Sequence, residues 1–579
     1  MIKKLSMLFV LLLLLAAGVT ACDQNQTASV KKDYGFTFKD ITKEAGIDFV
    51  HQKPQFDKKA EKIMPWLAST GAAVSVGDYN GDGFMDLYFV NSKKGSKNAL
   101  YENNGDGTFT EKKDLGITAI NQKGISTTAV WFDYDNDGKT DLFVGGWKNT
   151  KLFKNLGNGT FKDVTKKANL DFEAYTAKAI ALDYNKDGYL DLYIGNYFRP
   201  EIDLWNLNTS KIMHNDFEKA RNGGPNILYK NNGDGTFTDV TKETNTGDTG
   251  WTLATGAADI NGDGWPDLYN ANDFGPDVVY INKKGKGYEK LLQPRGVGDD
   301  TYKGMNVDFA DIFHDGRLSA YISNVSKERY IIEGNQLWYP SKSGKFLDKA
   351  EEMGVHRAGF SWGGRFMDIN NSGEMSLMVT NGFISASKKD NYWFELGTLA
   401  TTPGNIIEDY QNWPKIGDQS LSGYEKKHLF LNNGHTFKNV TQDVGINFIE
   451  DGRGAAAIDL DNDGDLDLVF ANQGFAPKVY KNQMKEKNHW IKLNLIGNGT
   501  TDNRDGVGAK VYITANGKKT LIERDGGNSH GAQSDPRIHF GLKKSKKADK
   551  ITVIWPSGIK QEFRNIKGDQ ILTIKEPKH

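Results

Sequence analysis

Cysteine is almost absent from the chain, since Cys22 is its single cysteine among 579 residues. An intramolecular disulfide is therefore excluded, and with it a small fold held together by disulfides. Proline is also scarce, with 14 residues against 64 glycines, whereas aromatic residues reach 11%. This composition favours many short strands joined by tight turns and argues against a long helical bundle.

The whole chain has no excess of positive or negative charge, since its formal net charge is -1. The charges are nevertheless distributed unevenly along it. Residues 481–579 contain 20 Lys and Arg against 10 Asp and Glu, which leaves about -11 on the rest of the chain. An acidic body attracts cations and repels polyanions. We therefore expect no nucleic-acid partner, and a separate basic domain at the C-terminus.

The N-terminus has no apolar run long enough to span a membrane, which needs about 20 residues. Lys3 and Lys4 precede an apolar run from Leu5 to about Val19, and small residues lead into Cys22. This pattern predicts a signal peptide over residues 1–21, and it resembles the bacterial lipobox. A lipidated Cys22 with a linker over residues 22–34 would anchor the protein to the membrane of the cell envelope, on its extracytoplasmic side. The alternative is an ordinary signal peptide with an incidental free cysteine.

A nine-residue acidic pattern, D-x-[DN]-x-D-G-x-x-D, repeats along the chain. It occurs five times in complete form and twice in degraded form, with a unit of a little over 50 residues and two long insertions. Apolar runs flank each copy, so each copy is predicted to be the turn of a β-hairpin. The complete copies span residues 78–86, 133–141, 183–191, 259–267 and 459–467, and the degraded copies span residues 311–319 and 368–376.

A second signature of two strands around an Asn/Gly turn follows most copies, as in residues 100–109 and 228–237. Four strands per unit and seven units predict an all-β fold, a seven-bladed β-propeller over residues 35–484. The last unit lacks its fourth strand, and the isolated segment 36–42 resembles one. We therefore expect a blade built from both chain ends. Residues 485–579 alternate polar and apolar residues and predict a small β-sandwich-like domain.

The acidic turns offer hard oxygen ligands at positions 1, 3, 5 and 9 and a backbone carbonyl at position 7, with glycine at position 6. Ca²⁺ takes such oxygens, whereas zinc would need His or Cys. An EF-hand is excluded because position 12 is not Glu in any copy. The sequence predicts about five calcium ions; metal-free Asx turns remain the alternative, and we expect them in the two degraded copies. The predicted ligands are Asp78, Asn80, Asp82, Phe84, Asp86, Asp133, Asp135, Asp137, Lys139, Asp141, Asp183, Asn185, Asp187, Tyr189, Asp191, Asp259, Asn261, Asp263, Trp265, Asp267, Asp459, Asp461, Asp463, Asp465 and Asp467.

These turns resemble the FG-GAP or VCBS calcium repeats of integrin-type propellers. Residues 488–493, 503–511, 533–542 and 554–558 resemble the ASPIC/UnbV module that ends cartilage-acidic-protein-like proteins. The two resemblances cover nearly the whole mature chain and imply a calcium-binding propeller. The tail also carries a lysine-rich run over residues 543–550, which is interpreted as a solvated loop or as a contact for acidic glycan or lipid headgroups.

Ligands of propellers gather where long loops meet, so the two insertions at about residues 197–226 and 381–427 are the candidate ligand site. Their aromatic residues suit sugar stacking or a protein contact, or they pack the insertions onto the propeller. The ligand-binding candidates are Trp205, Tyr392, Trp393 and Trp413, and no catalytic residue is assigned, because nothing in the sequence pairs His51, His214, Glu395 and Asp409. The favoured function is a non-enzymatic binding or adhesion protein for a glycan or protein ligand. The alternative, by analogy, is a carbohydrate-active enzyme of the lyase type.

Overall fold

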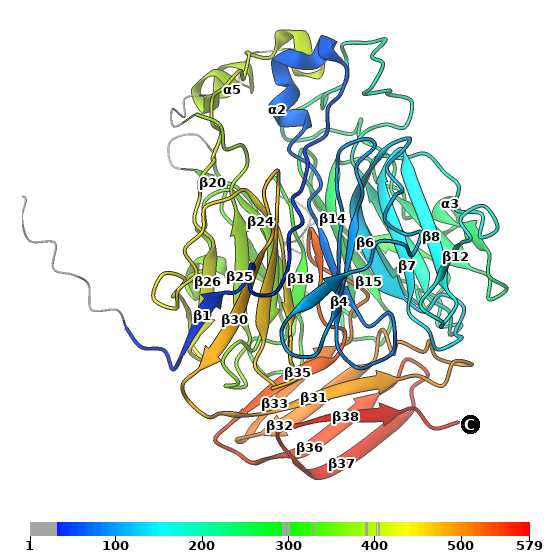
Figure 1. The fold of residues 1–579 in the computed structure, drawn as a ribbon, viewed down its shortest axis with the longest axis vertical. Coiled ribbons are helices and arrows are strands. Elements are labelled where there is room, and N and C mark those ends of the chain that lie inside the picture. Colours follow the sequence, from blue (N-terminus) through cyan, green and yellow to red (C-terminus); the bar gives the residue numbers. More distant parts are fainter. Residues whose placement is uncertain are drawn as a thin grey trace, which may run out of the picture. The chain divides into compact units, whose positions relative to one another are not determined.

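The computed structural model describes residues 32–578 except 292–296, 298–301, 328–330, 388–391, 401, 403 and 405. The predicted signal peptide and Cys22 lie outside the described residues. The chain divides into Met1–Tyr34 and Gly35–His579, and the sheets all belong to the second unit. Seven antiparallel sheets of four strands, one of them extended by a fifth, make up most of this unit (Figure 1).

Six of the seven sheets follow the chain in simple up-and-down order. Each begins with a mostly buried strand that contains small residues. Their strands are β2 (Val74–Gly77), β3 (Asp86–Phe89), β4 (Ala99–Asn103) and β5 (Phe109–Glu111); β6 (Ile125–Phe132), β7 (Asp141–Trp147), β8 (Asn149–Asn155) and β9 (Phe161–Asp163); β10 (Thr176–Leu182), β11 (Asp191–Asn196), β12 (Ile227–Asn231) and β13 (Phe237–Asp239); β14 (Thr252–Ala258), β15 (Asp267–Asn272), β16 (Val278–Asn282) and β17 (Tyr288–Lys290); β18 (Asp308–Ala310), β19 (Ser319–Ile322), β22 (Gln336–Pro340) and β23 (Phe346–Asp348); β24 (Ser361–Met367), β25 (Ser376–Asn381), β26 (His428–Asn432) and β27 (Phe437–Asn439).

The seventh sheet combines the two ends of the repeat region. Its order is β1 (Phe36–Asp40), β30 (Lys478–Met484), β29 (Asp467–Asn472) and β28 (Gly452–Ile458). Strand β1 pairs antiparallel with β30 from Phe36 opposite Met484 to Asp40 opposite Tyr480. The isolated N-terminal segment noted in the sequence therefore supplies the fourth strand that the last unit lacks.

The predicted hairpin role of the acidic pattern is seen in the structure, where each copy connects the first and second strands of a sheet. The glycine at position 6 has a positive φ in every copy, for example 88° at Gly83 and 95° at Gly264. Side chains rarely adopt this conformation, so glycine is required for the turn. Two degraded copies keep it, at Gly316 and Gly373.

The C-terminal domain consists of two sheets that share one hydrophobic cluster. The same cluster continues into the sheets of β18 and β24, so the domain packs directly on the repeat region at the bottom of Figure 1. The three-stranded sheet contains β31 (His489–Ile496), β35 (Ile538–Lys543) and β38 (Gln570–Lys575), and the four-stranded sheet contains β32 (Lys510–Ala515), β33 (Lys518–Glu523), β36 (Lys547–Ile554) and β37 (Lys560–Lys567).

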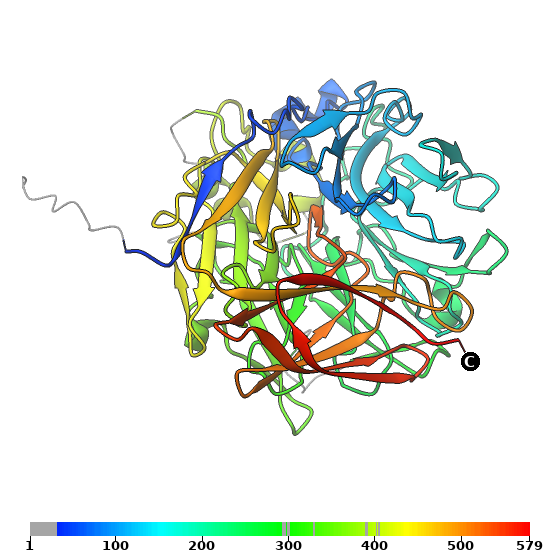
Figure 2. The same cartoon turned by 60° about the horizontal axis from the view of Figure 1, so that its bottom comes forward.

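One loop of this domain, residues 524–537 (the central loop), leaves the two sheets and runs up between the first strands of the repeat sheets (Figure 2). Its strand β34 (Ala532–Gln533) pairs in parallel with β2 as the fifth strand of that sheet. Its side chains and backbone form hydrogen bonds or ion pairs with residues of, or directly next to, all seven first strands: Ser75, Trp131, Ala181, Ala257, Val307, Arg365 and Ala457.

The central loop fits only because glycines line both sides of the contact. A Cβ atom at Gly526 would lie 1.7 Å from the carbonyl oxygen of Ala181, and one at Gly454 would lie 1.9 Å from that of Gly531. Backbone therefore meets backbone without room for a side chain.

Short helical segments lie on the opposite side, at the top of Figure 1, together with the insertions. The remaining elements are η1 (Lys58–Ile63), α2 (Met64–Leu67), α3 (Thr241–Thr244), β20 (Ser326–Lys327), β21 (Ile331–Ile332), α4 (Ala350–Met353), α5 (Tyr392–Ala400), η2 (Ile406–Glu408) and η3 (Tyr410–Asn412). No helix among the described residues is long and apolar enough to cross a membrane.

Candidate functional site

The aspartates that begin and end each complete acidic turn brace its backbone in the same way. At position 1, Asp133 accepts the backbone N–H groups of Asp137 (3.1 Å) and Gly138 (2.7 Å). At position 9, Asp141 accepts that of Tyr134 (3.2 Å) and that of Asn155 on the third strand (2.6 Å). Position 9 therefore joins the turn to the sheet as well as offering a carboxylate.

Two of the turns bring three carboxylates together. Ligand-type oxygens of Asp133, Asp135 and Asp141 lie within 4.8 Å of one another, and so do those of Asp459, Asp461 and Asp463. Burial, followed by the repulsion of neighbouring carboxylates, raises the pKa of Asp141 to about 9. Carboxylates held at such distances are stabilised by a shared cation or by protonation.

The side-chain oxygens in these two turns fit a hard cation. Oδ1 of Asp135 and Oδ1 of Asp461, both at position 3, are buried and have no hydrogen-bond partner in the part of the chain that the structure describes. All side-chain ligands are oxygens, which Ca²⁺ prefers. The remaining Oδ2 of Asp135 is held by Lys154, and that of Asp461 by Lys481.

The other three complete turns use an Asn at position 3, which bonds within the turn. In the turn at 78–86, Nδ2 of Asn80 donates to Oδ2 of Asp82 (2.8 Å), and Asn185 and Asn261 make the same bond to position 5. Burial raises the pKa of Asp86 to about 8. Their oxygen ligands are present, although only the 133 and 459 turns gather three carboxylates among the described residues.

The degraded turns hold the C-terminal domain by accepting its backbone N–H groups. Oδ2 of Asp311 accepts the backbone N–H of Leu521 (2.9 Å), and Oδ2 of Asp368 accepts that of Gly541 (2.8 Å). In the first of these turns His314 bonds both Thr520 of the C-terminal domain and Glu374 of the next turn, each at 2.7 Å. These two turns thus act as docking points.

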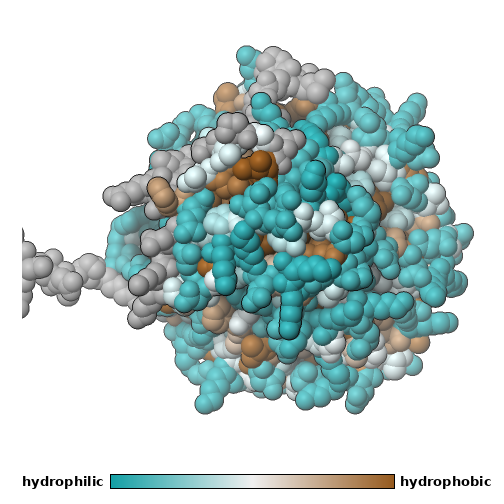
Figure 3. Space-filling model, turned by 90° about the horizontal axis from the view of Figure 1, so that it is seen from above, coloured by the Kyte–Doolittle hydropathy of each residue, from teal (hydrophilic) through white to brown (hydrophobic). Residues whose placement is uncertain are grey.

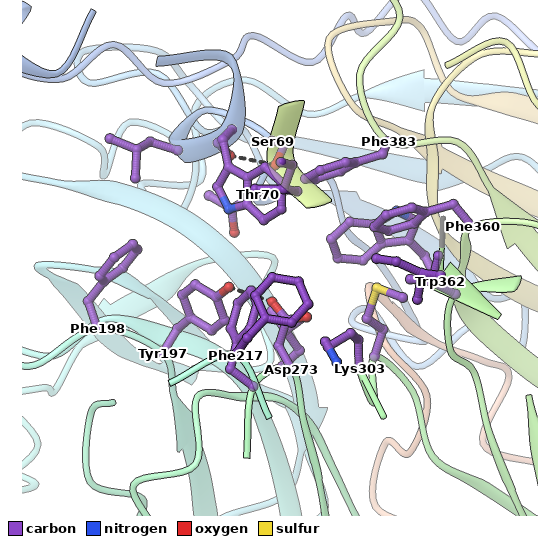
Figure 4. A pocket seen from close by; sticks show the side chains of 18 of the residues that line it. Ser69, Thr70, Tyr197, Phe198, Phe217, Asp273, Lys303, Phe360, Trp362 and Phe383 are labelled. Atoms are coloured by element: carbon purple, nitrogen blue, oxygen red, sulfur yellow. Dashed lines mark hydrogen bonds between the residues drawn. The ribbon is translucent and has the colours of Figure 1, made fainter. Parts of the chain in front are cut away.

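The second candidate site is a pocket whose lining side chains come from the insertions and from strand ends (Figure 4). It is a cavity of about 50 Å³, and half of its lining residues are aromatic. A cleft of about 900 Å³ adjoins it and shares Phe217, Lys303, Ile331, Trp393 and Leu396 with it. The aromatic lining residues are Trp66, Trp147, Tyr197, Phe198, Phe217, Phe274, Phe360, Trp362, Phe383 and Trp393.

Three polar side chains of this pocket and one of the adjoining cleft form two hydrogen-bonded pairs. The hydroxyl of Tyr197 donates to Oδ2 of Asp273 (2.6 Å), and the ammonium of Lys303 bonds Oε1 of Glu333 (2.6 Å). Burial raises the pKa of Asp273 to about 7 and that of Tyr197 well above its ordinary value. Lys303 Nζ also lies 4.8 Å above the ring of Phe217.

One large hydrophobic side chain is exposed at the adjoining cleft. Viewed from above, hydrophobic patches lie near the middle of this face and hydrophilic residues surround them (Figure 3). Phe394 of α5 lines the adjoining cleft and is 71% exposed. An apolar patch bordered by polar residues is typical of a binding surface.

Of the four ligand candidates from the sequence, the structure places only Trp393 in the pocket wall. Tyr392 and Trp413 are buried, and they bond the backbone carbonyls of Pro414 and Ile407. Trp205 packs edge-on against Phe56. Packing of the insertions, the alternative that the sequence left open, therefore describes three of the four.

The other single residues of the sequence analysis do not converge. His51 is buried and bonds Ser92, while Asp409 caps η3 and Glu395 lies on the exposed side of α5. His214 stacks on Phe274 at 3.5 Å, and neither of its ring nitrogens has a hydrogen-bond partner among the described residues. No catalytic group is formed by this set.

The sequence analysis missed most of the pocket, because its residues come from the strand ends. Trp147, Tyr197 and Asp273 each lie six residues after the last aspartate of an acidic turn, and Phe198, Phe274 and Phe383 lie seven residues after position 9. Counting from position 9 to the far end of the second strand would have identified them. The sequence does not show, however, that the ends of different sheets lie close together; only the three-dimensional structure does.

Comparison with known proteins gives two family matches. The FG-GAP-like repeat model matches residues 78–144, 133–194, 219–269, 259–322 and 420–470, and the model described as ASPIC and UnbV matches residues 499–579. Cartilage acidic protein 1 of Xenopus tropicalis is 24% identical over 316 residues, covering 50% of this chain and 40% of that protein. The Homo sapiens protein of the same name is 23% identical over 337 residues, covering 54% and 41%.

The chain thus spans about two fifths of the length of these relatives. Among solved structures, an Agrocybe aegerita lectin described as recognising non-reducing terminal N-acetylglucosamine aligns over 65% of this chain and 82% of its own. Its TM-score is 0.36 and its sequence identity is 15%.

Proposed function

We propose that this chain, which belongs to the proteins that combine FG-GAP-like repeats with a C-terminal ASPIC and UnbV domain, is a binding protein of the bacterial cell envelope. Its ligand is a glycan or a protein. This ligand binds at the aromatic pocket and the adjoining cleft. The single observation that carries this proposal is the pocket itself, whose lining combines ten aromatic residues, among them Tyr197, with Asp273 and Lys303, while Glu333 binds Lys303 from the adjoining cleft.

We infer that the seven repeat sheets form one closed seven-bladed propeller. The pairing of β1 with β30 supports closure, and so do the contacts between first strands, such as β2 with β6 and with β28. A closed ring leaves no open sheet edge to aggregate. It also separates the two faces, so that the acidic turns and the C-terminal domain lie on one face and the pocket on the other.

Calcium in this proposal stabilises the propeller and takes no part in the ligand site. The donors in the turns are oxygens, and the unpartnered Oδ1 atoms of Asp135 and Asp461 are suited to coordinate an ion. With dissociation constants of about 0.1 mM and about 1 mM free Ca²⁺, five sites would contribute about 7 kcal/mol. Chelation should therefore lower the melting temperature by many degrees. An unchanged melt of protein shown to be metal-free would remove calcium from the proposal.

The lyase alternative keeps one supporting observation, because Tyr197, Asp273 and Lys303 meet at one pocket. A tyrosine that acts as a base needs a lowered pKa, whereas burial and the nearby Asp273 raise that of Tyr197. Lys303 is held by Glu333 at 2.6 Å. These two features favour binding over catalysis.

The ligand site is tested by screening the calcium-loaded protein against glycan and protein arrays and then measuring the affinity of each hit for variants. Phe394→Ala removes an exposed ring at the cleft and should weaken binding about tenfold. Leu347→Ala is the matched control, since Leu347 is 43% exposed and does not line the cleft or the pocket. Equal affinities of both variants for every hit would place the ligand elsewhere.

The membrane anchor rests on the sequence around Cys22, outside the described residues. Cys22→Ser should abolish lipidation and leave the precursor uncleaved by the lipoprotein peptidase, so that detergent-phase partitioning changes. Identical partitioning of the variant and the wild type would remove the anchor from the proposal.

A further inference from the structure

The C-terminal domain buries two carboxylates beside each other, where one of its loops packs against Gly188 of the third acidic turn. Asp502 lies in the loop between β31 and β32 and is 0% exposed, and Glu576 directly follows β38 and is 5% exposed. Burying one carboxylate in a low dielectric is unfavourable, and burying two together is more so. Such a pair needs a compensating positive charge or a proton.

Asp502 has no such compensation among the residues that the structure describes. Its polar neighbours include the backbone N–H and the hydroxyl of Ser557, which act to lower its pKa, and the carboxyl group of Glu576, but neither of its carboxylate oxygens forms a well-aligned hydrogen bond within the described part of the chain. The charge of Lys186 acts on Asp502, but the structure shows no ion pair between them among the described residues, and the Lys186 ammonium lies 4.9 Å above the ring of Trp265. Buried charged oxygens are almost always hydrogen-bonded or bound to a metal, so this carboxylate is an exception to be explained.

The neighbours of Asp502 are held in fixed positions. Oδ1 of Asn498 accepts the backbone N–H groups of Thr500 (2.8 Å), Thr501 (2.9 Å) and Asp502 (3.3 Å), which fixes the loop. Glu576 accepts the backbone N–H of Asn498 at Oε2 (3.0 Å) and the hydroxyl of Ser557 at Oε1 (2.6 Å). Each Glu576 oxygen therefore keeps a free lone pair, and the Ser557 oxygen, which accepts the backbone N–H of Ile559 (3.3 Å), keeps one as well.

We propose that Asp502, Glu576 and Ser557 bind one Ca²⁺ ion in the C-terminal domain, in addition to any ions in the propeller turns. The ligands are hard oxygens, they come from three separate segments, and a divalent ion would balance the two carboxylates. The competing explanation is a proton shared by the two carboxyl groups. Repulsion by Glu576 adds to burial in raising the pKa of Asp502 to about 8, so the pair needs one or the other partner at neutral pH.

The experiment measures bound calcium per full-length chain after dialysis against buffered calcium. Asp502→Asn and Glu576→Gln keep the shapes of the side chains and should each lower the calcium content by about one ion. Asp549→Asn is the control, because Asp549 is an exposed aspartate of the same domain. Since the result is a difference between variants, it does not depend on whether the propeller turns bind calcium.

Hydrogen exchange gives a second readout that tolerates partial loss of stability. Calcium should slow amide exchange over residues 497–508 in the wild type and in Asp549→Asn, but not in Asp502→Asn. Equal calcium contents in all variants would overturn the proposal. If Asp502→Asn raises the melting temperature by the same amount with and without calcium, the two carboxyl groups share a proton and do not bind an ion.

Discussion

The ammonium of Lys492 lies 2.6 Å from Oδ2 of Asp459, and both side chains are fully buried. Lys492 belongs to β31 of the C-terminal domain, whereas Asp459 begins the last acidic turn of the repeats. Lys492 also lies 3.6 Å from Asp535 of the central loop. Although burial acts to raise it, Arg537 and Lys492 hold the pKa of Asp535 at about 2. The first ligand position of one turn is thus tied to the docked domain.

Lys492→Met should destabilise the protein by about 3–5 kcal/mol, because it leaves buried carboxylates without their cation. Calcium at the turn would compensate part of this charge, so we expect a larger loss in chelator than in calcium. Urea denaturation under both conditions measures the difference, with Lys487→Met, at an exposed lysine, as the control. A loss of equal size with and without calcium would show that the ion and the lysine act independently.

Asp463→Ala and Asp311→Ala should separate a cation-binding turn from a docking turn. Asp463 belongs to a cluster of three carboxylates, so its loss should lower the calcium content by about one ion. Asp311 instead accepts the N–H of Leu521, so its loss should leave calcium content unchanged and speed hydrogen exchange in β33. Calorimetric titration and hydrogen exchange on both variants test this; loss of calcium in both would contradict the distinction.

Gln533→Leu should loosen the central loop. Oε1 of Gln533 accepts the hydroxyl of Ser75 (2.5 Å) and the backbone N–H of Trp131 (2.8 Å), and its Nε2 donates to the carbonyl of Trp131 (3.0 Å). Leucine would leave these buried groups unpaired, at a cost of about 3 kcal/mol. Denaturation midpoints report the loss, and Gln52→Leu, at an exposed glutamine, is the control. Equal midpoints would mean that the loop is held by packing alone.

Asp273→Asn should stabilise the protein at high pH. Burial raises the pKa of Asp273 from 3.8 to about 7, so between about pH 4 and 7 the folded state binds more protons than the unfolded state. The free energy of unfolding therefore falls as the pH rises through this window, and the penalty is complete above it. The variant should melt higher than the wild type at pH 8 and equally at about pH 4.

Asp171→Asn provides the comparison for this pH series, because Asp171 is exposed. Its melting temperature should follow that of the wild type at both pH values. A constant offset between Asp273→Asn and the wild type at every pH would show that Asp273 does not titrate with the raised pKa.

Strand positions could be predicted well from the sequence, because they depend on local chemistry. The left-handed glycine at position 6 and the aspartates at positions 1 and 9 define each turn by themselves, as Gly83, Asp78 and Asp86 illustrate. Flanking apolar residues then give the strands. The partner of segment 36–40 was also predictable, because the last unit visibly lacked a strand.

The central loop and the pocket could not be predicted in this way. In the sequence, residues 526–531 resemble an ordinary glycine-rich turn. Only the structure shows that a Cβ atom at Gly526 would lie 1.7 Å from the carbonyl oxygen of Ala181, so that the two backbones are in direct contact. Asp273 and Lys303 lie outside both insertions, so a search for long aromatic loops passes over them. Such residues acquire their roles from neighbours that are remote in sequence.

The central loop also determines when the protein can finish folding during synthesis. Ser75 and Gln533 are 458 residues apart in the chain, and Thr37 and Gln483 in β1 and β30 are 446 apart. At about 5–20 residues per second, the ribosome needs tens of seconds between making the first member of each pair and the second. Throughout this interval the first strands lack their final neighbours in the middle of the unit. A nascent chain of this protein therefore depends on being kept from aggregation until the central loop has emerged from the ribosome.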